Sequence, residues 1–372
     1  MTDSRKIRVA LLFGGRSSEH AVSCVTAAGV MGAIDTEKYE VVPVGITRRG
    51  QWVLSDGDWH QWALNTGHAP EVSPAQATVQ LAEGGGRPRL VVSEPNRVPR
   101  ELGDVDVVFP LLHGAFGEDG TVQGLLELAD VRYVGAGVLA SAVGMDKHFM
   151  KVAFEAAGLT VGPYVAVTDR QWRRDPQSVR DAVGRLGYPV FVKPCRAGSS
   201  VGISRVEGPE GLDAAIEEAR RHDLRLVIEA GIVGREIECG VLEGRGCDAP
   251  RTSLPGEVAV RKDGHSFYDF EAKYVEDDAA ALSCPADLPE EAIARVRELA
   301  AVAFDAVAAE GLSRVDFFYT PEGEFVINEI NTMPGFTPIS MYPQMWAATG
   351  MSYPELIDEL IQLALARPTG LR

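Results

Sequence analysis

Short apolar runs alternate with amphipathic segments along most of the chain. The first unit combines an apolar run over residues 8–13, a glycine-rich turn, a small-residue segment with helical spacing that ends near Ala33, and an apolar run over residues 39–46. This alternation is typical of a parallel α/β unit. A further strand is predicted over residues 105–112, followed by a glycine-rich loop and a helix that ends near Asp130.

The stretch from about residue 47 to 99 shows only weak periodicity. It contains three tryptophans and a run of three glycines, and no helical or strand period persists through it. We interpret it as an insertion in an N-terminal α/β domain that spans residues 1–134.

The middle of the chain has one helical pattern and two strand patterns. Apolar residues at helical spacing predict a helix over residues 146–157, with Gly158 as its C-cap. Short apolar runs predict strands over residues 187–193 and 226–229. We expect a central domain over residues 135–229.

The remaining residues, 230–372, are expected to form a C-terminal domain. A long polar segment over residues 261–285 is a candidate lid. A helix over residues 290–309 is predicted to start at an Asp287-Leu-Pro-Glu290 capping box, and a terminal helix at a Ser352-Tyr-Pro-Glu355 box.

Between these two helices, β-rich runs flank Pro-Glu-Gly and predict a hairpin that carries charges. If the turn centres on Glu322 and Gly323, the two-residue period of strands places four polar side chains on one face. In chain order they are Arg314, Asp316, Glu329 and Asn331. The outer two then lie opposite each other, as do the two carboxylates between them. Facing carboxylates are unfavourable without a cation, which favours a hard divalent metal over the alternative, a solvated outer face.

A hydroxyl-rich loop follows the strand that ends at Lys193. Its sequence from residue 195 to 202, Cys-Arg-Ala-Gly-Ser-Ser-Val-Gly, allows backbone N–H groups, two hydroxyls and one ammonium to converge on phosphate oxygens. The loop is not a Walker A motif, because the lysine precedes the glycines. Beside the hairpin carboxylates, a site for magnesium-bound nucleotide is favoured; the alternative is a flexible surface hairpin.

Two other glycine-rich turns follow predicted strands and could expose donors to a ligand. Glu19 lies in the first turn, where it could cap the following helix or bind a substrate ammonium. His113 lies in the second, where it is either a hydrogen-bonded loop residue or a ligand contact. The mixed charged and aromatic segment 267–274 is a solvated loop or an active-site cover, and we favour the cover.

Composition limits the possible partners and the compartment. A formal net charge of −17 argues against nucleic acid and anionic membranes. The five cysteines lack paired short spacings, which indicates reduced thiols rather than disulfides or a zinc site. The first apolar run is strand-sized, and no stretch is long enough to span a bilayer, so a cytoplasmic location is expected.

In their order and number, these motifs resemble those of the ATP-grasp carboxylate-amine ligases, most closely the D-alanine:D-alanine ligases. The matching segments are Gly14-Gly-Arg-Ser-Ser-Glu19-His20, Leu112-His113-Gly114, Gly117-Glu-Asp-Gly120, Met145-Asp-Lys147, Lys193-Pro194, Gly198-Ser-Ser-Val-Gly202, Glu229, Gly234-Arg-Glu236, Glu271-Ala-Lys273-Tyr274, Arg314-Val-Asp316 and Asn328-Glu-Ile-Asn-Thr-Met-Pro-Gly335. The resemblance covers nearly the whole chain outside residues 47–99. It implies a three-domain α/β ATP-grasp architecture, in which two α+β domains follow the N-terminal parallel domain and sandwich ATP.

The resemblance implies that ATP drives the ligation of two D-alanines through an acyl phosphate, for peptidoglycan precursor synthesis. Tyr274 stands where relatives that form a D-alanine:D-lactate ester carry His, which favours the dipeptide product. The alternatives are an ATP-grasp ligase with another second substrate, D-lactate or D-serine, and a regulatory protein that binds nucleotide without ligation. A homodimer is expected from the resemblance alone.

The resemblance also implies roles for individual residues. Two Mg²⁺ or Mn²⁺ ions would be held by Asp316, Glu329 and Asn331. The ATP site would comprise Lys147, Lys193, Ser200, Glu229, Ala230, Ile232, Glu236 and Lys273. The catalytic residues would be Glu19, Ser199, Tyr274, Arg314 and Gly335, and the other substrate contacts His113, Ser340 and Met341. Ala230 stands where many relatives carry Lys, so recognition there is expected through the backbone.

Overall fold

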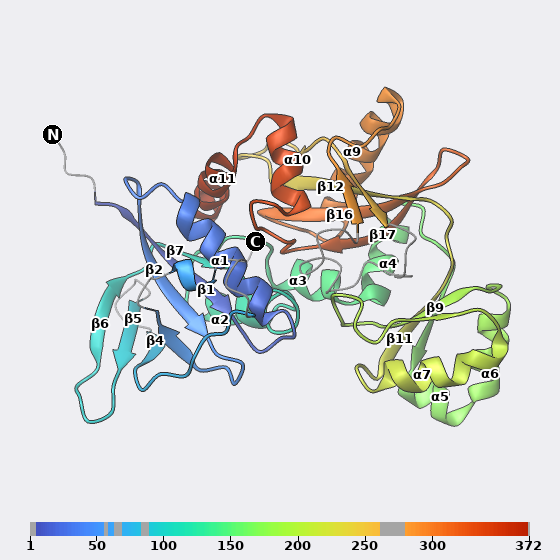
Figure 1. The fold of residues 1–372 in the computed structure, drawn as a ribbon, viewed down its shortest axis with the longest axis horizontal. Coiled ribbons are helices and arrows are strands. Elements are labelled where there is room, and N and C mark those ends of the chain that lie inside the picture. The colour runs from blue at the N-terminus through green and yellow to red at the C-terminus, as the bar shows by residue number, and fades with distance from the viewer. Residues whose placement is uncertain (1–4, 56–58, 63–68, 83–88, 261–279, 371–372) are drawn as a thin grey trace.

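The computed structural model describes residues 5–55, 59–62, 69–82, 89–260 and 280–370. Their strands form four sheets. Figure 1 shows the N-terminal elements at one end of the molecule, the sheet that contains β9 and β11 at the other end, and β12, β16 and β17 between them. None of the helices in the described ranges is long and apolar enough to cross a membrane.

The first sheet is buried on both faces. Its strands in spatial order are β3 (Trp52–Leu54), β2 (Tyr39–Ile46), β1 (Ile7–Gly14) and β7 (Val107–Pro110). The central strand β1 runs parallel to β2 and β7, as predicted. One face packs on α1 (His20–Ala33) and α11 (Tyr353–Ala366), and the other on α2 (Thr121–Leu128). Burial on both faces explains why β1 is apolar without alternation.

The weakly periodic stretch contains strands that the sequence did not predict. An antiparallel sheet is formed by β4 (Thr78–Ala82), β5 (Arg89–Ser93) and β6 (Arg100–Asp104), and a 3₁₀ turn, η1 (Trp59–Trp62), precedes it. Leu90 and Val92 pack against the same core as α2. Each strand has only a short alternation of apolar and polar residues, and a register shift at Leu90 interrupts the pairing with β6. The two-residue strand period was therefore too brief to recognise in the sequence.

The central sheet is antiparallel. Its spatial order is β10 (Ser204–Val206), β9 (Val190–Pro194), β11 (Arg225–Ala230) and β8 (Tyr164–Thr168). Its apolar core is shared with α5 (Asp169–Arg174), α6 (Pro176–Gly184) and α7 (Leu212–Arg220), which follows the turn η2 (Pro209–Gly211). The lysine-bearing strand β9 is thus held in the middle of the sheet.

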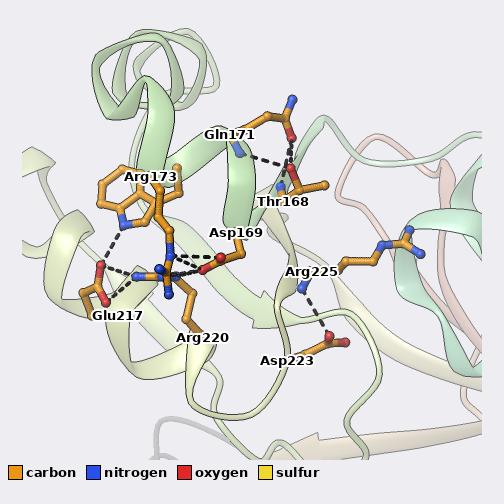
Figure 2. Close-up of polar contacts among 9 residues, drawn as sticks. Thr168, Asp169, Gln171, Arg173, Glu217, Arg220, Asp223 and Arg225 are labelled. Atoms are coloured by element: carbon orange, nitrogen blue, oxygen red, sulfur yellow. Dashed lines mark hydrogen bonds and ion pairs between the residues drawn. The ribbon is translucent and has the colours of Figure 1, made fainter.

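Polar contacts connect the end of β8 to these helices (Figure 2). Thr168 and Gln171 form a reciprocal capping box at the start of α5. Arg220 of α7 binds the Asp169 carboxylate, with Nε at 2.9 Å, and also donates to Glu217 at 2.6 Å. The arginine therefore joins α5 to α7.

The third large sheet lies between the other two and packs against helices from different parts of the chain. Its strands are β15 (Ala280–Ser283), β14 (Gly256–Val260), β12 (Arg235–Leu242), β16 (Leu312–Tyr319) and β17 (Phe325–Asn331), with β13 (Arg251–Thr252) paired to β12. One core joins the sheet to α3 (Val138–Met145), α4 (Lys147–Ala156) and α9 (Glu290–Ala306). Residues of α10 (Met341–Thr349) pack with α11 in the core of the first sheet. The C-terminal helices therefore connect the first and third sheets.

The hairpin of β16 and β17 has the predicted pairing at its polar end, but not for the predicted reason. Its turn brings Tyr319 opposite Phe325, one residue out of the register expected from a turn centred on Glu322 and Gly323. A β-bulge between Asp316 and Phe317 then restores the offset. After the bulge the carboxylates at 316 and 329 pair, as do residues 314 and 331. Without the extra residue, the polar side chains of β17 would face the core.

Two predicted capping boxes have different outcomes. At the start of α11, Ser352 and Glu355 form the predicted reciprocal box. At α9 the prediction was wrong: the helix begins at Glu290, its N-cap is Pro289, and no side chain caps it. Asp287 lies two residues too early for an N-cap, because a side-chain cap must immediately precede the first helical residue.

We predict that Ser352→Ala lowers the free energy of unfolding by about 1 kcal/mol, the usual effect of losing an N-cap side chain. Asp287→Ala is the matched control, because the box it would form with Glu290 does not exist; its change should stay within about 0.5 kcal/mol. Urea unfolding followed by circular dichroism measures both. Equal losses in the two variants would contradict the assignment.

Candidate active site

A cavity of about 390 Å³ lies where the three large sheets meet. It is lined by side chains from the turn after β1, the loop after β7, the hydroxyl-rich loop, β11 and the hairpin face. Those named in the sequence prediction are Glu19, His113, Lys147, Lys193, Ser199, Ser200, Glu229, Ala230, Ile232, Glu236, Arg314, Asp316, Glu329, Asn331 and Gly335. The tertiary structure therefore brings most of the predicted site residues to one cavity.

The hairpin face is not solvated, which excludes the alternative considered from the sequence. The side chains of Arg314 and Asp316 are only 15% and 14% exposed. Arg314 forms two parallel hydrogen bonds to Asp316, each 2.7 Å long, and its Nε lies 3.2 Å from Glu238. Asn331 Nδ2 donates to Asp316 Oδ2 at 3.0 Å. The face is a partly buried polar network that opens into the cavity.

Cationic side chains from α4 and β9 meet carboxylates of two sheets. Lys147 Nζ lies 3.2 Å from Glu329 Oε2, and Lys193 Nζ lies 2.6 Å from Glu229 Oε2. The second oxygen of Glu229 lies 2.9 Å from Lys151 Nζ. Burial alone would raise the pKa of Glu229, but Lys193 and Lys151 lower it to about 2. The sequence prediction missed Lys151, whose only signal was its position one helical turn after Lys147.

The hydroxyl-rich loop has an unusual backbone. Ser199 and Ser200 have φ values of 48° and 57°, in the left-handed region that serine rarely adopts. Ser199 Oγ donates to Glu19 Oε1 at 2.5 Å, across 180 residues of sequence. In the same loop, Cys195 is buried, and burial raises the pKa of its thiol to about 12, which excludes a thiolate nucleophile.

Glu19 does not cap the helix that it precedes. It occupies the N-cap position of α1 without a side-chain cap hydrogen bond. Its carboxylate instead lies against the backbone of Gly114 and Gly198; a Cβ on Gly114 would stand 2.5 Å from Glu19 Oε2. Glycine is therefore required at Gly114 for this carboxylate to reach its place.

His113 is buried between the first and third sheets. Its Nδ1 lies 3.0 Å from the carbonyl oxygen of Met333, and its Nε2 lies 3.2 Å from Thr26 Oγ1. A carbonyl can only accept, so Nδ1 carries the proton. Burial lowers the pKa of His113, which favours the neutral ring despite the nearby Glu19.

Glu118 is a second residue that the prediction missed. Its two carboxylate oxygens accept from the N–H groups of Gly114 at 2.8 Å and Met333 at 3.0 Å. Burial and the charge of Glu19 raise the pKa of Glu118 to about 8. The Gly-Glu-Asp-Gly120 motif was visible in the sequence, but nothing local showed that its glutamate reaches the loop after β17.

Of the predicted site residues, two lie outside the described part of the chain and two lie apart from this group. Tyr274 and Lys273 fall outside the described residues, as does most of the candidate lid. Ser340 is the N-cap residue of α10 and bonds to Thr337, while Met341 is buried in the core that includes α10 and α11. Neither Ser340 nor Met341 is among the residues that line the cavity.

The hairpin face fits a magnesium-nucleotide complex by the chemistry of its donors. Asp316, Glu329 and Asn331 offer carboxylate and amide oxygens, and magnesium in proteins is commonly held by one or two carboxylates together with substrate phosphates. Across the described residues, no three acidic, histidine or cysteine side chains alone form a cluster that could hold a metal. Nucleotide oxygens would complete the coordination.

The fold and the site together define the ATP-grasp class of ligases. Two family models match the chain: "D-ala D-ala ligase N-terminus" over residues 8–136 and "D-ala D-ala ligase C-terminus" over residues 153–362. The chain belongs to the D-alanine:D-alanine ligase family.

Individual relatives agree with this placement. A protein of Pseudarthrobacter chlorophenolicus named D-alanine–D-alanine ligase is 77% identical over 99% of this chain and 96% of its own length. A Kocuria rhizophila protein with the same name is 59% identical over 98% of this chain and 95% of its own. The crystal structure of VanG D-Ala:D-Ser ligase from Enterococcus faecalis is similar with a TM-score of 0.81 and 36% identity, over 97% of this chain and all of that one. The D-alanine-D-alanine ligase structure from Coxiella burnetii gives 0.79 and 34%, over 97% and 94%.

We predict that Glu229→Gln destabilises the fold at neutral pH by about 3 kcal/mol, because the buried Lys151 and the partly buried Lys193 lose their shared carboxylate. The pKa of Glu229 is lowered, so its contribution is complete above about pH 4.5 and is lost as the pH falls toward about 2. The difference between wild type and variant should therefore shrink below pH 4.5. Unfolding free energies measured between pH 3 and 7 check this.

The control is Glu322→Gln, in the exposed turn of the hairpin. It should leave both the stability and its pH dependence near the wild-type values. A difference between Glu229→Gln and wild type that stays constant down to pH 3 would contradict the role given to the Glu229 charge.

Proposed function

We propose that this protein joins two molecules of D-alanine in a reaction driven by ATP, and releases D-alanyl-D-alanine, ADP and phosphate. One observation carries the proposal: a single cavity presents Glu19 and Ser199 together with Lys147, Lys193 and the hairpin face. Glu19 and Ser199 suit an ammonium, the two lysines suit a phosphate chain, and the hairpin face suits a developing oxyanion. The names of relatives at 77% and 59% identity support the choice of D-alanine for both substrates.

The chemistry has two steps. A carboxylate oxygen of the first D-alanine attacks the γ-phosphorus, the bond to the β-phosphate oxygen breaks, and ADP leaves. The amine of the second D-alanine then attacks the acyl carbon, loses a proton, and expels phosphate from a tetrahedral intermediate. Phosphoryl transfer of this kind depends mainly on positioning and charge neutralisation.

The phosphates would lie beside Lys147 and Lys193, with Ser200 in the hydroxyl-rich loop. Asp316, Glu329 and Asn331 would hold two Mg²⁺ or Mn²⁺ ions. When bound, these ions would neutralise phosphate charge during transfer. Arg314 and Asn331 already direct their donors at Asp316, which holds that carboxylate in place at the cavity.

The adenosine would occupy the part of the cavity lined by Ala230, Ile232 and Glu236. The backbone of residues 229–232 would recognise the adenine, and Glu236 the ribose hydroxyls. Glu236 is exposed toward this part of the cavity, which suits a contact with a polar ring. Lys273 is proposed to approach the γ-phosphate from the segment outside the described residues.

The first D-alanine would bind by its ammonium to Glu19. The hydrogen bond from Ser199 leaves the second oxygen of Glu19 available beside Gly114 and Gly198, where the absence of Cβ atoms provides space. The neutral ring of His113 would lie near this substrate. Tyr274 is proposed to complete a Glu19–Ser199–Tyr274 link when the lid closes.

Arg314 and the N–H of Gly335 would stabilise the oxyanion of the tetrahedral intermediate. Both line the cavity, and donors fixed before the reaction stabilise developing charge more than mobile donors do. Arg314 is held by Asp316 and Glu238, so it needs no reorganisation as the charge forms.

Several expectations from the resemblance stay predictions. Ser340 and Met341 are proposed near the carboxylate of the second D-alanine. A homodimer, a cytoplasmic location and a place in peptidoglycan precursor synthesis rest on the same resemblance. Light scattering coupled to gel filtration measures the assembly.

A substrate panel tests the reaction. We expect release of ADP and phosphate with ATP and D-alanine, and none with L-alanine. D-Lactate or D-serine as the second substrate should give less than a tenth of the D-alanine product, measured by mass spectrometry. Preferential product formation with either alternative would overturn the assignment of the second substrate.

Variants of the hairpin face test its division of roles. Asp316→Ala and Glu329→Ala should reduce turnover at least about 10³-fold and weaken binding of magnesium-ATP, because both remove metal ligands. Arg314→Lys should lower kcat about 10²-fold with little change in KM for ATP, because it removes forked donors to the transition state. Wild-type affinity for magnesium-ATP in the two alanine variants would contradict the metal assignment.

A further inference from the structure

The buried Lys151 is a charged group that the proposed mechanism does not use. Its side chain is only 3% exposed, and it is not among the cavity-lining residues. A lysine is rarely buried to this extent without a partner, because its ammonium loses most of its hydration. Here the partner is Glu229 Oε1, 2.9 Å away, and the ring of Tyr164 lies 5.8 Å from Nζ. Burial lowers the pKa of Lys151, whereas the Glu229 carboxylate raises it and, with the Tyr164 ring, favours the charged form.

Glu229 is shared between two lysines with different access. Its Oε2 binds Lys193 at 2.6 Å, and Lys193 lines the cavity, whereas Lys151 is enclosed between α4 and β11. Without Lys151, Lys193 and Glu229 would form a neutral closed pair. Such a pair has little attraction for an anion, because the carboxylate cancels the field of the ammonium.

In the described part of the chain, no neighbouring lysine could take the place of Lys151 and keep the charge of Lys193 uncancelled. Lys147, one helical turn before Lys151, lies 3.2 Å from Glu329 and is compensated there. Figure 1 shows α4 close to β17 and above β9 and β11. The helix therefore contributes Lys147 to the third sheet and Lys151 to the central sheet.

We propose that Lys151 is a positioning residue for ATP: by sharing the Glu229 carboxylate, it leaves Lys193 with a net positive charge for the phosphate chain. The three groups carry +1 in the wild type, zero in Lys151→Met, +2 in Glu229→Gln and +1 in the double variant. The inference rests on the proposed function, because it takes Lys193 to contact ATP phosphates.

Titration calorimetry with magnesium and a nonhydrolysable β,γ-imido ATP analogue tests the charge count. Lys151→Met should weaken binding about tenfold, the effect of one partly screened charge. Lys151→Arg, which keeps the charge, should stay within about threefold of the wild type. Adding Glu229→Gln to Lys151→Met should restore most of the lost affinity, although each substitution alone disturbs the buried pair.

Adenosine is the matched ligand control, because it carries no phosphate. Its affinity should be the same in the wild type, in Lys151→Met and in Lys151→Arg, neither of which changes a residue that lines the cavity. Equal loss of adenosine and analogue binding in Lys151→Met, or a double variant that binds worse than Lys151→Met, would overturn the proposal and leave Lys151 as a packing residue.

The experiment also separates a failure of the proposed ATP site from a failure of Lys151→Met to fold. If wild-type protein binds adenosine and the analogue equally, Lys193 does not recognise phosphate, and both this inference and the proposed ATP site are overturned. If Lys151→Met does not fold, the comparison uses Lys151→Arg and the double variant, which removes both charges of the buried pair. The double variant should still bind the analogue within about threefold of the wild type, and a tenfold loss confined to the analogue would overturn the charge assignment.

Discussion

The cavity depends on the rule that a buried charge must have a partner. Arg314, Lys147 and Lys193 would each destabilise the fold if they were enclosed alone, because the loss of hydration exceeds any packing gain. Each is paired with a carboxylate: Arg314 with Asp316, and the lysines with glutamates of different sheets. Because α4 pairs Lys147 with Glu329 of the third sheet and Lys151 with Glu229 of the central sheet, this pairing links the two sheets through one helix.

The same rule gives the site its local electrostatics. The whole chain carries −17, so an anionic nucleotide would be repelled on average. Attraction requires cations whose charge is not fully cancelled. The sharing of Glu229 between Lys193 and Lys151 provides this, because one carboxylate compensates two ammonium groups. Gly114 and Gly198 have no side chains, and this leaves room for the carboxylate of Glu19.

Hydrogen bonds between the first and third sheets also fix the positions of Glu118 and His113. Glu118 joins the loop after β7 to Met333, just before Gly335, so the loop that would carry an oxyanion donor is held against the N-terminal sheet. His113 makes a parallel connection through the Met333 carbonyl. These contacts couple the substrate end of the cavity to the hairpin that would hold the metal. Movement of either sheet would therefore change the distance between Glu19 and Arg314.

Outside residues 47–99, the sequence by itself predicted many of the strands and helices in their order, and it placed Glu19 and Lys193 at glycine-rich turns, because turn chemistry and apolar periodicity are local properties. It also predicted the carboxylate pairing of the hairpin, although a bulge and a different turn produced that pairing. Only the tertiary structure decided that Ser199 binds Glu19 and that Lys151 shares Glu229. Such contacts join residues far apart in the chain, and they depend on how separate sheets pack, for which no local pattern exists.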